Sequence, residues 1–240
     1  IDNLDGSSGS AIEFTNYNDE RVVVDGTTPI SSTWTQVGSS NIWSTKLSAD
    51  IWQLFINWEE QVMARWPNAK FSDDTVWDND NYWAKGTIDD DENAYTNGTI
   101  IDDPYTNSAG TTIDLSATSF DLDETNKQAI AILNLGSFKT WSRLVTSHSG
   151  NTFNYATVPT WKTKHHYYYL EGRKEFLDQE GEWWYDTYNN ADSLYYFTAN
   201  GVNPNRLDFR GKVQSYAFSI TGSQYVQIKN LEFFATTVYF

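Results

Sequence analysis

The fold of this chain is decided by YAFSITGSQYVQIKNLEF, residues 216–233. Two short runs of alternating apolar and polar residues lie on either side of the polar corner Thr221-Gly222-Ser223, and Asn230 marks a second corner. Each rung of a β-solenoid needs short strands that bury alternate side chains and turn sharply at small residues or Asn. The stretch therefore predicts all-β structure, in which short strands stack rung on rung.

A second segment, near the N-terminus, has the same rhythm. AIEFTNYNDERVVVDG, residues 11–26, holds an alternating run and a β-branched run that ends at the turn dipeptide Asp25-Gly26. Successive rungs of a solenoid run in the same direction. We therefore expect parallel pairing between residues 11–26 and residues 213–233.

Helix signals are weak in the rest of the chain. Residues 49–65 are ambiguous, because their apolar positions fit a helix or strands, and a hairpin could turn at Asn57. Trp66-Pro67-Asn68 then ends any regular element. EWWYDTYNNADSLYYF, residues 182–197, predicts a hairpin that turns at Asn189-Asn190.

Composition excludes several classes of partner. The net charge is −16, from 32 acidic and 16 basic residues. Nucleic acid is excluded because its phosphates require clusters of Lys and Arg, and no apolar run is long enough for membrane insertion. There is no cysteine, so an exported form of this chain needs no disulfides. The chain starts at Ile1 and ends at Phe240 within an apolar stretch, and we expect it to be a piece of a longer protein.

Three stretches resemble secreted right-handed parallel β-helix proteins of the carbohydrate-active kind, which are glycoside hydrolase-like or polysaccharide lyase-like. The stretches are VVVDG (22–26) with QLFIN (53–57) and ARWPN (64–68); YLEG (169–172) through LD (177–178) to GEWWYD (181–186) and SLYY (193–196); and Ile220 through VQIKNLEF (226–233). Their order and spacing match the family over nearly the whole chain. Asn57-Trp58-Glu59 departs from it, because a Gly-containing turn is more usual there.

The resemblance implies a right-handed parallel β-helix whose first coils are interrupted by a β-rich, sandwich-like insertion. Residues 1–54 would form the first coils, residues 55–203 the insertion with long acidic loops, and residues 204–240 the re-entry into the β-helix. It also implies a secreted protein, located extracellularly or on the cell surface. Catalytic acids of such enzymes generally lie on later coils, so the resemblance assigns no catalytic residue to this sequence.

Glu180 and Glu182 are the most suggestive acids, because they lie beside Trp183 and Trp184. A carboxyl group beside apolar rings has a raised pKa, which suits the general acid of glycoside cleavage. The alternative is a hairpin face with solvated acids, and that is what we expect.

Residues 73–123 are polar and acidic, and we expect long surface loops there. Two acidic runs within them offer the oxygen ligands that Ca²⁺ prefers. They are Asp73-Asp74 with Asp78 and Asp80, and Asp89-Asp90-Asp91-Glu92. Neither has the spacing of an EF-hand, so we expect solvated loops and keep Ca²⁺ as the alternative; no other cofactor is expected.

The leading hypothesis is the N-terminal part of a secreted carbohydrate-active protein, inactive as an isolated chain, with polysaccharide as the partner. The alternative is a non-catalytic adhesive or filament-forming surface protein that associates through the ends of its solenoid. In either case Trp66-Pro67-Asn68 and Trp183-Trp184 are expected to be packing elements.

Overall fold

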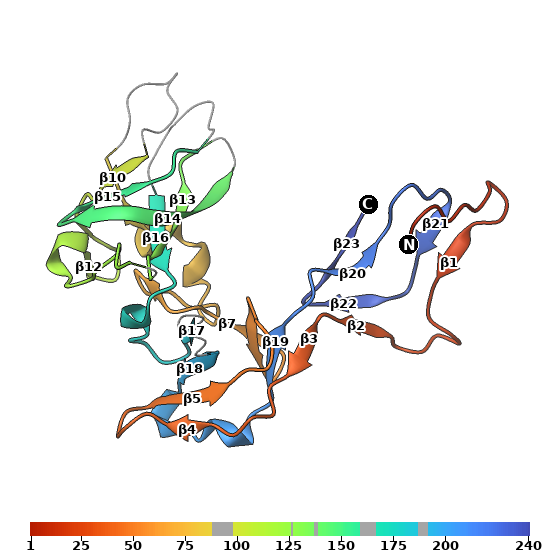
Figure 1. Cartoon of the computed structure of the whole chain (residues 1–240), viewed down its shortest axis with the longest axis horizontal. Helices are drawn as coiled ribbons and strands as arrows, with labels where there is room; N and C mark the ends of the chain where they lie inside the picture. The colour runs from red at the N-terminus through yellow and green to blue at the C-terminus, as the bar shows by residue number, and fades with distance from the viewer. Residues whose placement is uncertain (88–97, 126, 137–138, 159–166, 187–191) are drawn as a thin grey trace. The chain divides into compact units, whose positions relative to one another are not determined.

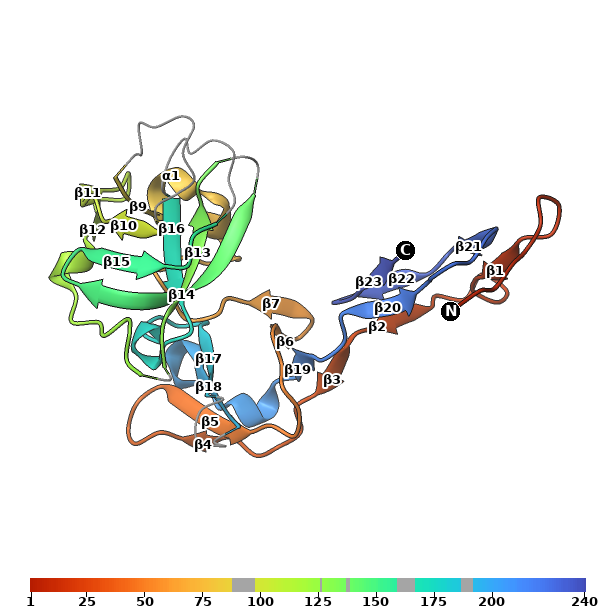
Figure 2. The same cartoon turned by 45° about the horizontal axis from the view of Figure 1, so that its top comes forward.

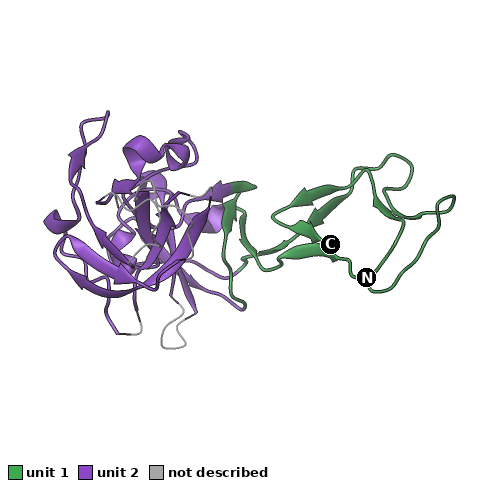
Figure 3. Cartoon of the chain, turned by 90° about the horizontal axis from the view of Figure 1, so that it is seen from above, with its two compact units in different colours: residues 1–31, 49–59, 208–240 green, residues 32–48, 60–207 purple. Residues whose placement is uncertain are grey.

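The computed structural model describes residues 1–87, 98–125, 127–136, 139–158, 167–186 and 192–240. It is all-β, as expected, and most of its strand pairs are antiparallel (Figure 1). The chain divides into two compact units, coloured separately in Figure 3. Unit 1 comprises residues 1–31, 49–59 and 208–240, and unit 2 comprises residues 32–48 and 60–207.

Unit 1 contains three two-stranded parallel sheets (Figures 1 and 2). The pairs are β1 (Ile12–Phe14) with β21 (Val226–Ile228), β2 (Val23–Asp25) with β22 (Glu232–Phe234), and β20 (Tyr216–Ser219) with β23 (Thr237–Tyr239). The parallel pairing expected between residues 11–26 and 213–233 is therefore confirmed.

The corners between these strands use left-handed backbone conformations. Tyr225, Asn230 and Ala235 have positive φ values of 51°, 54° and 51°, and they lie before β21, before β22 and before β23. Gly26 lies at the corner after β2, where a Cβ atom would lie only 2.6 Å from the carbonyl oxygen of Ala235. Glycine is therefore required for the backbone at residue 26 to approach the backbone at Ala235 this closely.

Unit 1 also holds the antiparallel strands β3 (Thr27–Pro29), β19 (Phe209–Lys212) and β6 (Leu54–Ile56), in that order. Gly211 on β19 packs against Ile51, whose side chain would lie 2.3 Å from a Cβ atom there. The buried apolar residues of unit 1 are Ile51, Leu54, Phe55, Ile56, Phe209 and Ile220.

The ambiguous segment 49–65 forms strands. β6 is followed by a turn at Asn57 and Trp58, both with positive φ, and then by β7 (Glu59–Gln61) and β8 (Arg65–Trp66). β8 ends at Trp66, directly before Pro67, as the sequence indicated.

The main sheet of unit 2 is antiparallel, with the order β10-β15-β14-β13-β16-β8, and β9 also pairs with β16. Its central strands β13 and β16 alternate strictly, since Ala131 and Leu133 on β13 and Tyr168 and Leu170 on β16 are fully buried. The strands are β9 (Ala84–Lys85), β10 (Thr99–Ile101), β13 (Ile130–Asn134), β14 (Thr140–Ser149), β15 (Thr152–Tyr155) and β16 (Tyr167–Glu171), with β8 as given above.

A second antiparallel sheet of unit 2 has the order β17-β18-β5-β4. It consists of β17 (Trp183–Asp186), β18 (Ser193–Phe197), β5 (Ile42–Lys46) and β4 (Thr35–Gln36). The hairpin expected in residues 182–197 is confirmed by the pairing of β17 with β18. Its Asn189-Asn190 turn lies outside the described residues.

Residues 73–123 are more than surface loops. Ile100, Ile113, Leu115 and Leu122 are buried in the main core of unit 2. Their apolar side chains are single and widely spaced, so no periodic pattern revealed them. The remaining elements, within residues 73–123 and after β16, are short: η1 (Thr75–Trp77), α1 (Asn79–Tyr82), β11 (Tyr105–Thr106), β12 (Thr112–Ile113), η2 (Leu115–Ala117), η3 (Lys174–Phe176), η5 (Ala199–Gly201) and η6 (Pro204–Arg206).

None of the helices in the described ranges is long and apolar enough to cross a bilayer. The domain boundaries implied by the resemblance remain predictions.

Candidate functional site

A pocket of about 500 Å³ opens beside the parallel pair β2–β22 in unit 1. In this pair Val23 lies opposite Glu232 and Asp25 lies opposite Phe234. Residues two apart on a strand share a face, so these four side chains lie on one face of the sheet. The pocket is lined by Arg21, Val23, Asp25, Trp58, Glu232, Phe233 and Phe234.

Trp58 is the main aromatic surface of the pocket. Its side chain is held by the Arg210 guanidinium, 4.6 Å from the ring centre, and by an edge contact with Phe234 at 4.9 Å. Phe55 supports Phe234 from within unit 1, at 4.8 Å between ring centres. Even so, Trp58 remains 51% exposed. The indole is thus fixed in position but open to a ligand.

The charged groups of the pocket are paired. Arg21 donates two hydrogen bonds to Glu232 through Nε and one through Nη2, the shortest at 2.7 Å. Asp25 accepts hydrogen bonds from the Thr27 backbone N–H and hydroxyl and from the Arg210 guanidinium. These contacts fix the carboxylates in place, since each oxygen is oriented by a donor.

Both carboxylates of the pocket have lowered pKa values. Partial burial raises the pKa of Asp25, but the hydrogen bonds from Thr27 and the charge and hydrogen bond of Arg210 outweigh it, and the net shift is downward. The hydrogen bond from Arg21 lowers the pKa of Glu232. Glycoside cleavage needs one carboxyl group that stays protonated to act as an acid. Asp25 and Glu232 are therefore not suited to act as a general acid.

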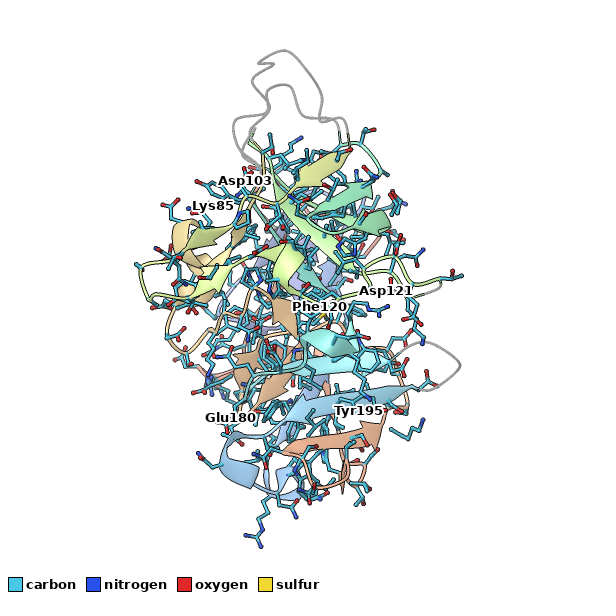
Figure 4. The ribbon with its side chains drawn as sticks, turned by 90° about the vertical axis from the view of Figure 1, so that its left-hand side faces the viewer. Lys85, Asp103, Phe120, Asp121, Glu180 and Tyr195 are labelled. Carbon is cyan, nitrogen blue, oxygen red and sulfur yellow. The ribbon has the colours of Figure 1, made fainter. Side chains whose placement is uncertain are left out.

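In unit 2, Glu182 is fully buried, with 0% exposure, so the expected hairpin face of solvated acids is wrong for this residue. Its Oε2 accepts hydrogen bonds from the backbone N–H groups of Asp178 and Gln179, at 3.2 and 3.1 Å. Burial raises the pKa of Glu182 to about 8 despite these bonds. Glu180 is only half-buried and accepts a hydrogen bond from the Asn200 backbone (Figure 4).

A buried cation lies near this acid. Arg65 is directly opposite Glu171 in the β8–β16 pair, and its guanidinium lies 3.7 Å from the ring centre of Tyr169. It donates hydrogen bonds to the carbonyl oxygens of Pro67 and Tyr82. Burial lowers the pKa of Arg65 to about 10 and raises the pKa of Glu171 to about 7. Arg65 and Glu182 are buried, at 3% and 0% exposure, and their polar contacts are to backbone and core groups, so we assign them a structural role.

Asp102 and Tyr168 form a second buried polar contact in unit 2. The Tyr168 hydroxyl donates to Asp102, which also accepts the Leu115 backbone N–H at 2.9 Å. Burial raises the pKa of both groups. In Figure 4, Asp103 lies beside Lys85, in agreement with the backbone hydrogen bond between them. The hydrogen bond between Tyr168 and Asp102 ties the segment around residue 102 to β16 of the main sheet.

A smaller pocket in unit 2, of about 260 Å³, is dominated by ion pairs. Arg173 donates to Glu124 and Glu175 at 2.9 and 3.0 Å, and its side chain is almost wholly buried. Lys174 lies 4.9 Å from the ring centre of Tyr195, a residue labelled in Figure 4. Most of the charge that lines this pocket is therefore paired within the protein.

Within the described ranges, no group of three or more acidic or His side chains is arranged to hold a metal ion. Asp73 accepts hydrogen bonds from Thr75, and Asp78 caps α1 by accepting from Asn81. The second acidic run, Asp89-Asp90-Asp91-Glu92, lies outside the described residues. The Ca²⁺ alternative is therefore not supported at Asp73 and Asp78.

Among the predicted packing residues in unit 2, Pro67, Trp183 and Trp184 are buried, whereas Trp66 and Asn68 are half-buried. Trp183 is 1% exposed and donates its indole N–H to the Gln61 carbonyl at 2.9 Å. Trp184 donates to the Gly172 carbonyl, and Trp66 packs against Tyr168 and Phe120. The burial of Trp183 and Trp184 leaves neither ring open to a sugar.

Sequence reasoning missed the pocket beside Trp58. It recognised Asn57-Trp58-Glu59 only as an unusual turn, and that departure was the one available signal. Glu232 and Phe234 become neighbours of Asp25 only through the parallel register, which brings together residues from opposite ends of the chain.

No protein-family model matches this chain, and no curated protein matches it. Among solved structures, a protein titled "Glycoside hydrolase" is similar over 96% of this chain, with a TM-score of 0.61 and 15% sequence identity. The chain spans 40% of the length of that protein. At this identity the likeness establishes a shared fold alone: the chain has the fold of part of a glycoside hydrolase.

Proposed function

We propose that this chain is the N-terminal part of a secreted carbohydrate-active protein built on a right-handed parallel β-helix. In this proposal β1, β2 and β20 belong to one coil, and β21, β22 and β23 belong to the next. The antiparallel strands of unit 1 and the whole of unit 2 form the β-rich insertion between β2 and β20, which extends beyond the residues 55–203 that the resemblance implies. The segment is structural or flanks the substrate, and the catalytic acids lie elsewhere in the protein.

The parallel pairing is the observation that carries the proposal. β20 pairs with β23 after one circuit of the chain, with Tyr216 opposite Thr237. β1 and β2 pair with the two strands that lie between β20 and β23, in the same order and direction. This pairing supports an arrangement of two successive coils. A right-handed coil is favoured because parallel crossover connections are right-handed in almost all proteins.

The sheet edges support a further coil. In the described structure β21, β22 and β23 each pair with a strand on one side only. An edge of this kind presents backbone N–H and C=O groups that a further parallel strand can pair with. The likeness to part of a longer protein titled "Glycoside hydrolase" supports the same interpretation.

A test of the proposal compares this chain with the natural protein that contains it. Both are incubated with a panel of polysaccharides, and new reducing ends and ultraviolet-absorbing unsaturated products are measured. We expect the natural protein to cleave a member of the panel and the 240-residue chain to show only background. The physical reason is that the pocket acids of this chain are ionised, whereas cleavage needs a protonated acid.

Two results would contradict the proposal. One is turnover by the chain itself that is lost in Glu182→Gln or Asp25→Asn. The other is a natural protein that cleaves no polysaccharide and binds none.

The unpaired edges also favour a second candidate function, that of a non-catalytic adhesive or filament-forming surface protein. Tyr216 and Tyr239 form an exposed ring pair on β20 and β23, 5.3 Å apart. In this alternative the natural protein has many regular coils without convergent acids, and the coil ends associate. Clustered Asp or Glu residues on one face of successive coils would decide in favour of the enzyme.

A further inference from the structure

The strongest unexplained feature of unit 1 is the backbone at Trp58. Its φ is 72°, a left-handed conformation that bulky residues rarely adopt, and Asn57 before it has φ 50°. Two successive left-handed residues form the tight turn for which Asn-Gly is the preferred pair. Here tryptophan occupies the position that suits glycine. Strained residues of this kind cluster at ligand sites, so the indole at this position calls for a function.

The conformation presents the ring to the pocket. Arg210 and Phe234 hold the indole, half of its surface stays open, and the pocket beside it measures about 500 Å³. This volume lies within the range of roughly 300–1,000 Å³ that is typical of small-molecule sites. A fixed, open aromatic face loses little conformational entropy on binding, which favours flat apolar surfaces such as the C–H face of a sugar ring.

The polar groups of the pocket suit hydroxyl groups. Glu232 and Asp25 are carboxylates held in place by Arg21 and Arg210, and they have lone pairs that can accept hydrogen bonds from a ligand. Both arginines are already paired, so the pocket has no spare positive charge for an anionic ligand. The net charge of −16 adds long-range repulsion of polyanions.

We propose that the pocket beside Trp58 binds one sugar unit of a neutral polysaccharide, stacked on the indole and hydrogen-bonded to Glu232 and Asp25. The choice of ligand class rests on the proposed function. The pocket holds the polysaccharide without cleaving it, so it is a substrate-positioning site and not a catalytic one.

The test measures binding of xylohexaose, cellohexaose and maltohexaose to the 240-residue protein by isothermal titration calorimetry, with hexagalacturonate as the anionic comparison. The decisive variant is Trp58→Gly, because glycine suits the left-handed turn and the fold should survive the loss of the ring. Trp52→Ala is the matched control, since Trp52 belongs to the same unit, is 46% exposed and lies outside the pocket.

We expect at least one neutral hexasaccharide to bind, with an affinity that changes little between low and high salt. Trp58→Gly should weaken binding by at least about tenfold, corresponding to the loss of one stacked ring. Trp58→Phe should keep most of the wild-type affinity, because it retains an aromatic ring. Trp52→Ala should bind as tightly as the wild type. Circular dichroism of each variant verifies that the fold is retained.

Three results would overturn the inference. If a neutral hexasaccharide binds equally well to Trp58→Gly and the wild type, the sugar site lies elsewhere and the proposed function survives. If hexagalacturonate binds and the neutral sugars do not, the ligand class is wrong. If no probe binds and the natural protein also cleaves no polysaccharide, the proposed function fails together with the site.

Discussion

Replacing Trp183 with alanine should lower the free energy of unfolding by about 3–5 kcal/mol, the range for deletion of a large buried aromatic ring. Trp183 is 1% exposed, and its indole N–H satisfies the Gln61 carbonyl. The variant loses the burial of the ring and this hydrogen bond, and it leaves a cavity between β17 and its neighbours. Denaturant unfolding followed by near-ultraviolet circular dichroism measures the change.

The matched control is Trp77→Ala. Trp77 also lies in unit 2, but it is 74% exposed, so its replacement should change stability by no more than about 0.5 kcal/mol. If Trp183→Ala keeps the stability of the wild type and loses glycan binding, Trp183 is a ligand platform and its assignment as a packing residue is wrong.

Glu182 should make the protein less stable as the pH rises. The folded-state pKa is raised to about 8 from the ordinary value of 4.5, so the folded protein binds this proton more tightly than the unfolded chain. The stabilisation that comes from protonated Glu182 is fully present below the pKa of this group in the unfolded chain, and it is lost as the pH rises toward 8. The loss is a few kcal/mol, at most about 5 kcal/mol at 1.36 kcal/mol per pKa unit.

Glu182→Gln should remove most of this loss, because glutamine fills the same space and carries no charge. Its free energy of unfolding should exceed that of the wild type at pH 8.5 and approach it near pH 4.5. Part of the slope should remain up to about pH 7, because burial also raises the pKa of Glu171 to about 7. Glu180→Gln, at a half-buried neighbour, serves as the control and should keep the wild-type slope. Equal pH profiles for Glu182→Gln and the wild type would show that Glu182 is solvated after all.

Local rhythm was enough to predict the all-β fold and two specific pairings. The short alternating strands of residues 11–26 and 216–233 predict the parallel pairs, because each strand carries its own pattern and its own corner residues. The hairpin of β17 and β18 could be predicted for the same reason. In these cases the information lies within a few neighbouring residues.

The rest depends on contacts between distant residues. The burial of Glu182 follows from the packing of β17 against other segments of unit 2, and a single Glu between aromatic residues looks the same in sequence whether it is solvated or buried. The pocket beside Trp58 requires the turn after β6, the register of β2 with β22, and Arg210 on β19. No local sequence pattern predicts that these distant segments meet, so the pocket could be found only in the structure.

A crystal structure of the longer protein that we propose for this chain would test the β-helix most directly. We expect a later strand to pair with the open edge of β21, and others to pair with β22 and β23, all parallel and in a right-handed coil. We also expect clustered Asp or Glu residues on one face of the later coils. Edges that stay open, or that are covered by antiparallel strands, would show that the proposed β-helix is wrong.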